Sequence, residues 1–315
     1  MSNFMFSLNA TLPVFLVIVL GWFLMQKKMF NENFVDIINK FVFKVSLPVL
    51  LFKDIATTPI KDAFDPKFVI FCMVGTTIMF MGIWALTSIF MKDKSMVGAF
   101  TQASARGSAA VLGIAFVQNI YGNSGMAPLM IIGSVPLYNI MAVVVLSFTK
   151  PGQNGMSPEL IKKTLKGIAT NPIILGILAG ALWSVLRLPM PTILTKTVSS
   201  LGGLTTPLGL MAMGAAFNWS EAKSGMGPAF AASFMKLIGL CTLFLPVAVL
   251  LGFREAELIA ILVMLGSSTT VSSYVMARNM GHSGVLSSSI VAITTLGSAF
   301  SLTFWLYVLK TLALI

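Results

Sequence analysis

Two polar stretches interrupt apolar segments and have residue types that could bind an anion. The first, at 100–119 (FTQASARGSAAVLGIAFVQN), carries Arg106 near its centre, and a guanidinium binds a carboxylate through two parallel hydrogen bonds. The second, at 260–279 (AILVMLGSSTTVSSYVMARN), has seven small or hydroxyl residues in the eight positions 266–273. Hydroxyl groups and the free backbone N–H groups at a helix start can hold a negative charge. Together the two stretches predict an anion site.

The candidate substrate-binding residues lie in these stretches and in one further apolar segment. Arg106 supplies charge complementarity, while the interrupted helices supply N–H and hydroxyl donors. Asn139 lies deep in an apolar segment, where its amide must find a partner on a neighbouring helix or on a ligand. These candidates are Arg106, Gly107, Ser108, Asn139, Ser267, Ser268, Thr269, Thr270, Ser272 and Ser273.

Structural explanations remain open for the same residues. Gly, Ser and Thr also let membrane helices pack closely, and Arg106 could pair with backbone carbonyls. At a rise of 1.5 Å per residue, however, Arg106 lies about 15 Å deep, near the middle of a bilayer about 30 Å thick. An ionisable residue at that depth indicates a functional site. Lys44 and Lys236 are further cations inside apolar runs. Lys40 and Lys44 share a helical face, and we expect these two to line protein or water rather than bind ligand.

The composition shows which elements must position these residues. The 315 residues are 57% hydrophobic and 10% charged, with a mean hydropathy of +0.92. A soluble domain has about 25% charged residues, so the chain is neither an ordinary soluble enzyme nor a nucleic-acid module. The net charge of +11 indicates cytoplasmic loops rich in Lys and Arg. We find no Walker loop, metal-ligand pair or nucleophile elbow, and therefore expect no enzymatic activity, cofactor or metal.

Apolar runs of about 20 residues predict an all-α integral membrane protein. The lysine cluster at 162–166 favours a cytoplasmic central loop, at 151–164, with both termini outside. Ten runs, numbered here as spans one to ten, lie at roughly 6–25, 34–53, 67–91, 95–119, 126–149, 165–187, 192–217, 227–252, 255–279 and 285–310.

An offset of 159 residues superimposes the Gly and Pro residues of the two halves. It predicts a five-helix repeat at 1–150 and a second at 165–315. Because each repeat holds an odd number of spans, the second is inverted relative to the first. Inverted repeats with matching interrupted helices are typical of secondary transporters, whose substrates bind near the membrane midplane. The superimposed pairs include Pro13 with Pro172, Gly21 with Gly180, Pro48 with Pro207, and Gly107 with Gly266.

Five segments resemble the auxin efflux carrier family, which includes bacterial malate and malonate permease relatives. In span four, Ser108 and Gly113 match the family's small-polar and glycine positions, while Ala115 replaces the family's proline; the proline of span nine is also missing, near Ser272. The resemblance adds Gly113 to the candidate site. The segments are VSLPVLLF (45–52), SAAVLGIAFVQNIYG (108–122), PLYN (136–139), PLGLMAMGAAF (207–217) and SSYVMAR (272–278).

This resemblance implies ten helices, with spans four and nine crossing at unwound centres. It also implies a scaffold of spans one, two, six and seven and a mobile domain made of the rest. We therefore expect a secondary transporter of a small organic anion, such as malate, malonate or an auxin-like acid, in the bacterial inner membrane. No Asp or Glu lies in mid-span, so we expect transport not to require sodium.

Two other functions fit the sequence. A sodium-coupled symporter of the bile-acid type would share the helical architecture. A membrane receptor or sensor for a carboxylate or sterol would share the buried polar groups, although the sequence has no soluble output domain. The expected partners are the anion and the lipid bilayer, without nucleic acid, and a homodimer is compatible with the sequence.

Overall fold

The computed structural model describes residues 13, 16–57, 65–109, 117, 120, 126–152, 158–217 and 219–315. These residues form helices and no strands, as expected for an all-α protein. The helices are α2 (Glu32–Phe41), η1 (Val42–Ser46), α3 (Leu47–Ala56), α4 (Pro66–Phe90), η2 (Lys94–Met96), α5 (Val97–Ala105), α7 (Ala127–Phe148), α8 (Pro158–Ala169), α9 (Pro172–Val185), α10 (Thr192–Gly203), α11 (Thr205–Ala215), α12 (Trp219–Phe234), η3 (Met235–Gly239), α13 (Leu240–Leu250), α14 (Glu255–Gly266), α15 (Ser272–Asn279) and α16 (Gly284–Thr311).

Four helices in the described part of the chain are long and apolar enough to cross a membrane. They are α4, α7, the continuous helix Gly225–Leu250 and α16. Many of their large apolar side chains point outward, such as Leu250 with 86% of its surface exposed. A soluble surface would rarely carry so much exposed apolar area, whereas lipid accommodates it. The expectation of an integral membrane protein is therefore confirmed.

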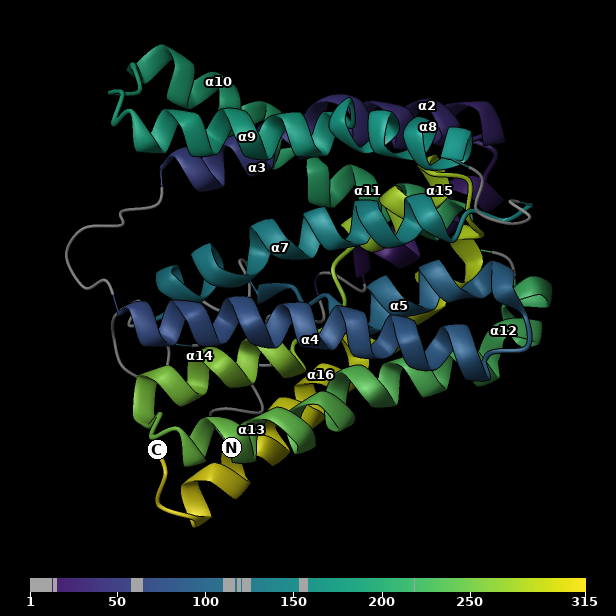
Figure 1. The fold of residues 1–315 in the computed structure, drawn as a ribbon. Coiled ribbons are helices and arrows are strands. Elements are labelled where there is room, and N and C mark those ends of the chain that lie inside the picture. The colour runs from purple at the N-terminus through teal and green to yellow at the C-terminus, as the bar shows by residue number, and fades with distance from the viewer. Residues whose placement is uncertain are drawn as a thin grey trace.

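The helices pack around a core formed by α5, α7, α14 and α15. Figure 1 shows α3, α9 and α10 along one edge of the molecule and α13, α14 and α16 along the other, with α7 between them. Small residues bring helices close together: a Cβ atom on Gly133 of α7 would lie 2.8 Å from the Cβ of Cys72 on α4. This close packing encloses the polar residues at the centre.

Local sequence explains where several helices begin. Pro66 starts α4, and the carboxylate of Asp65 accepts the N–H of Phe68 at 3.2 Å. Asn171 starts α9 in the same way, accepting the N–H of Ile173 at 2.9 Å. Each side chain satisfies an N–H that has no partner within the helix. Because Asn171 ends one helix and caps the next, the predicted span 165–187 is divided between α8 and α9.

The segment predicted as a central loop at 151–164 contains the first turns of a helix. The helix α8 already begins at Pro158, a residue that is favourable in a first helical turn. The alternation of apolar residues with lysines gives α8 an amphipathic pattern, which sequence punctuation by Pro and Gly did not reveal. The described connection from α7 therefore includes a helix.

Candidate functional site

The first interrupted helix, α5, ends at the centre of the molecule. Its residues are all buried, and its last hydrogen bond runs from the N–H of Arg106 to the carbonyl of Gln102. Arg106 itself has an extended backbone, with φ −81° and ψ 132°. Beyond it, the N–H of Ser108 donates to the carbonyl of Ser268 at 2.8 Å. The end of α5 is thus joined to a distant part of the chain.

The second interruption separates α14 from α15 at residues 267–271, and it lies in the predicted span nine. Its hydroxyl residues replace the missing helical hydrogen bonds. The hydroxyl of Thr269 donates to the carbonyl of Ala103 at 2.7 Å, and its N–H donates to the hydroxyl of Thr294 at 3.0 Å. The expected interruption of span nine is confirmed, and it contacts the end of α5.

Arg106 lies where the two interruptions meet, with only 3% of its surface exposed. Its Nη2 donates to the amide oxygen of Asn139 at 2.8 Å and to the hydroxyl of Ser272 at 2.7 Å, while Nη1 contacts the sulfur of Met276. Its Nε–H has no partner among the described residues. The guanidinium is therefore held by three neutral groups from α7 and α15.

No carboxylate among the described residues compensates the charge of Arg106. The ion pair that the described residues do form joins Arg278 to Asp36, at the end of α15. A charge near the bilayer centre costs about 2.5–3.5 kcal/mol even on the most favourable scale. An anion entering this site would supply the missing charge.

The remaining predicted residues lie along the two interruptions, with one exception. Gly107 lies against Ser267, so that a Cβ atom there would collide with the serine hydroxyl. The hydroxyl of Thr270 is 3.2 Å from that of Ser272. Ser268 is buried and Ser108 is half-buried. Gly113 lies outside the described residues.

Two of the predicted residues, Ser267 and Ser273, have buried hydroxyls without a hydrogen-bond partner among the described residues. The amide oxygen of Gln102 is also without a partner, although its nitrogen donates to the carbonyl of Ser273 at 2.8 Å. Buried polar groups normally find partners, so these three are available to a ligand or water. Gln102 was not predicted, although it precedes Arg106 by one helical turn.

Lys236 is the second cation at the centre and has no exposed surface. Its ammonium donates to the carbonyls of Leu265 at 2.7 Å and Met264 at 3.2 Å. The hydroxyl of Tyr138 donates to the Met264 carbonyl as well, at 3.0 Å. Lys236 therefore lines protein, and its position at the end of α14 was not predicted from the sequence.

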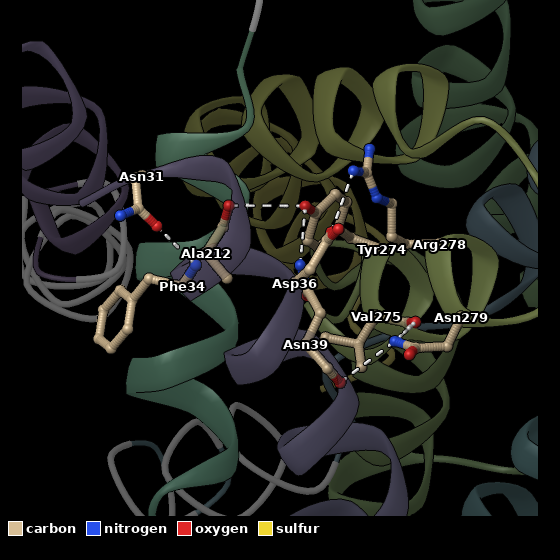
Figure 2. A network of polar contacts seen from close by, with 9 residues as sticks. All are labelled: Asn31, Phe34, Asp36, Asn39, Ala212, Tyr274, Val275, Arg278 and Asn279. Carbon is tan, nitrogen blue, oxygen red and sulfur yellow. Dashed lines mark hydrogen bonds and ion pairs between the residues drawn. The ribbon is translucent and has the colours of Figure 1, made fainter.

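A second polar network, which does not include Arg106, connects α2 with α15 and α11 (Figure 2). The side-chain amide of Asn39 donates to the Tyr274 hydroxyl at 3.4 Å, and the side-chain amide of Asn279 donates to the backbone carbonyl of Asn39 at 3.1 Å. At its end, Arg278 pairs with Asp36 at 3.2 Å, and both side chains are about half exposed. This network fixes α15 against α2.

Apolar helices that surround a polar centre, where helices are interrupted, are typical of membrane transport proteins. The chain belongs to this class: the family described as "Membrane transport protein" matches residues 6–306, and the expected relation to auxin efflux carriers is confirmed. A relative from Rhizobium meliloti (strain 1021), described as "Putative malonate transporter", is 24% identical over 307 residues, which cover 96% of each chain. The protein is a multi-pass membrane transporter rather than an enzyme.

Proposed function

We propose that the protein is a secondary transporter of a small carboxylate, which binds at Arg106. The observation that carries this proposal is a buried guanidinium without a carboxylate partner, located where two interrupted helices meet. Arginine suits this role because its donors match the two oxygens of a carboxylate. The partnerless Nε–H and the hydroxyls of Ser267 and Ser273 would supply further donors.

The substrate class follows from the same geometry and from the relative. Malonate, malate and auxin-like acids all carry at least one carboxylate, and the Rhizobium meliloti relative is described as a "Putative malonate transporter". A rocking or elevator motion of one domain against the other would expose Arg106 to each side in turn. Neither step needs a catalytic residue, because the substrate leaves chemically unchanged.

Pairs of contacts that are related by 159 residues support the inverted-repeat architecture. Gly21 packs against the backbone of Met211, and Gly180, its counterpart in the second half, packs against the backbone of Phe52, the counterpart of Met211. Ser46 and Thr205 are also counterparts, separated by 159 residues, and their hydroxyls share a hydrogen bond of 2.7 Å. Counterparts that contact each other would lie on the two-fold axis between the repeats. Such reciprocal contacts are expected where two copies of one unit face each other.

We further propose ten spans in the bacterial inner membrane, with the loop before α8 in the cytoplasm and both termini outside. Cysteines introduced at Lys92 and Leu188, which are both exposed, should then react with an impermeant reagent from opposite sides of the membrane. The native Cys72 and Cys241 are buried and should remain unreactive. Reaction of both introduced cysteines from outside intact cells would exclude this topology.

Malonate uptake into proteoliposomes tests the proposed function directly. Purified protein should accumulate labelled malonate in response to its gradient, and vesicles without protein should not. Malonate should also raise the melting temperature of the protein in detergent, because a ligand stabilises the state that binds it. Stabilisation without uptake would instead favour a receptor, and neither effect with malonate, malate or a monocarboxylate would refute the proposal.

A further inference from the structure

The helix α14 ends at the interruption, with its last carbonyls at the centre of the protein. Membrane transporters often hold a cation at such a helix end. The last carbonyls of a helix have no partners within the helix and carry partial negative charge. In interrupted membrane helices, such carbonyls commonly coordinate Na⁺. In this protein the carbonyls of Met264 and Leu265 instead accept hydrogen bonds from Lys236.

A π-helix is what directs Lys236 to this position. The segment η3 is part of the continuous helix Gly225–Leu250, and the carbonyl of Leu237 within η3 accepts the indole N–H of Trp305 at 3.1 Å. Single π-helical turns occur frequently at functional sites. The turn of η3 places the ammonium inside the protein, 3.0 Å from the position of a Cβ on Gly107.

Burial and charge distinguish Lys236 from a lysine that only fills space. The residue has no exposed surface, and no carboxylate among the described residues pairs with it. Its partners are the two carbonyls, and the partnerless hydroxyl of Ser267 lies on the same side of Gly107. The site therefore has oxygen ligands that suit a cation and already contains a positive charge.

We propose that Lys236 is a tethered cation that replaces a dissociable sodium ion at the carbonyl end of α14. A covalently attached charge travels with the protein through the whole cycle, so the carboxylate moves without a coupled sodium ion. Its charge also adds to that of Arg106, since the two residues flank Gly107. This inference rests on the proposed function, because it assigns a role within the same transport site.

The first test measures sodium binding by the purified protein, without any substrate. The wild-type melting temperature should be the same in sodium chloride and in choline chloride. In Lys236→Ser the ammonium is removed and a hydroxyl remains beside the two carbonyls and Ser267. Sodium should then raise the melting temperature of this variant in a saturable way, by about 2 °C or more. A saturable effect of sodium on the wild-type protein would overturn the proposal.

The matched control is Lys44→Ser. Lys44 also lies in a π-helix, η1, but its side chain is exposed. Sodium should leave the melting temperature of this variant unchanged, as in the wild-type protein. An equal response of the two variants to sodium would show that the effect does not come from the carbonyl end of α14, and the proposal would fail.

The second test measures malonate uptake in choline and in sodium buffers. In choline, the rate of malonate uptake by Lys236→Ser should be at least about tenfold lower than that of the wild-type protein. Sodium should restore part of this rate. Lys236→Arg, which keeps the charge, should retain uptake that is independent of sodium. If Lys236→Ser does not fold, Lys236→Gln replaces it in this comparison, and the wild-type sodium titration still decides. Wild-type rates in choline for either neutral variant would overturn the proposal.

The two proposals fail in different ways. If neither the wild-type protein nor Lys236→Arg transports malonate but sodium stabilises Lys236→Ser, the tethered cation stands and the carboxylate substrate is wrong. If the wild-type protein transports malonate but sodium has no effect on Lys236→Ser, the proposed function stands and the tethered cation is wrong.

Discussion

Arg106 and Arg278 both belong to the central helices, yet they differ in burial and in the charge of their partners. Arg278 is about half exposed and has a carboxylate partner, Asp36, at 3.2 Å (Figure 2). Arg106 is almost completely buried and has only neutral partners among the described residues. The paired arginine is thus the one that needs a partner least, because water already stabilises its charge.

This difference indicates what each charge is for. An exposed ion pair contributes only about 0–1 kcal/mol, so the contact between Arg278 and Asp36 positions α15 without a large energy. A buried charge that lacks a counter-ion is destabilising, and such residues in membranes mark sites of function. The four predictions below remove a charged residue, change its partner, or fill the space beside it.

The largest effect is expected from Arg106→Ala. Removing one partner of a buried, charged hydrogen bond costs about 2–5 kcal/mol, so malonate affinity should fall at least about thirtyfold. Arg106→Lys should retain part of the affinity, since it keeps the charge but loses the paired geometry. Isothermal titration measures both variants, with Arg254→Ala, at the exposed start of α14, as the control. Unchanged affinity in Arg106→Ala would make this residue structural.

A smaller effect is expected from Asn139→Asp, which would give Arg106 a carboxylate partner, as Arg278 has in Asp36. The amide oxygen of Asn139 is 2.8 Å from Nη2 of Arg106, so an aspartate of the same shape would form an internal ion pair there. It would compete with the substrate, and malonate affinity should fall about tenfold, equivalent to about 1.4 kcal/mol. The melting temperature should stay the same or rise. A lower melting temperature with unchanged affinity would contradict a shortage of negative charge at Arg106.

Gly107→Ala should have a moderate effect on both stability and uptake. The added methyl group would lie 3.0 Å from the ammonium of Lys236 and closer still to Ser267. Overpacking of this kind costs about 1–3 kcal/mol. Gly203→Ala is the matched control, because nothing lies within 4 Å of the added methyl group. Thermal melting compares the two variants, and equal melting temperatures would show that the space beside Gly107 is not restricted.

The smallest effect is expected from Asp36→Asn. It removes the partner of Arg278, but both side chains are about half exposed, so stability should fall by at most about 1 kcal/mol. The loss should decrease further at high salt, because salt screens exposed charges. Malonate affinity should not change. A loss of affinity comparable to that of Arg106→Ala would place this ion pair in the binding site as well.

The interrupted helices could be predicted from sequence because their residue types are unusual in a membrane. Hydroxyl residues at 266–273 and a guanidinium inside an apolar run are both costly in lipid, which makes them visible in a single sequence. The apolar runs also located most helices within a few residues. The sequence did not predict that Asn171 divides the run 165–187 into two helices, because a single polar capping residue does not stand out among the apolar residues on both sides.

The contacts of Lys236 and Gln102 could not be predicted in the same way. Whether a buried lysine lies on a carbonyl depends on how its helix is rotated, and the π-helix η3 changes that rotation without a recognisable sequence pattern. Gln102 lies one turn before Arg106, but its bond to the Ser273 carbonyl depends on the packing of α5 against α15. Both contacts are tertiary, and local residue patterns do not determine them.

The hydrogen bond from the Ser108 N–H to the Ser268 carbonyl has a consequence for evolution. It joins the two halves of the chain at the centre, and it is formed by backbone atoms alone. Nineteen of the twenty amino acids at position 108 retain this donor, and only proline removes it. Side chains around this junction can therefore diverge to recognise new substrates without removing the hydrogen bond that connects the two halves.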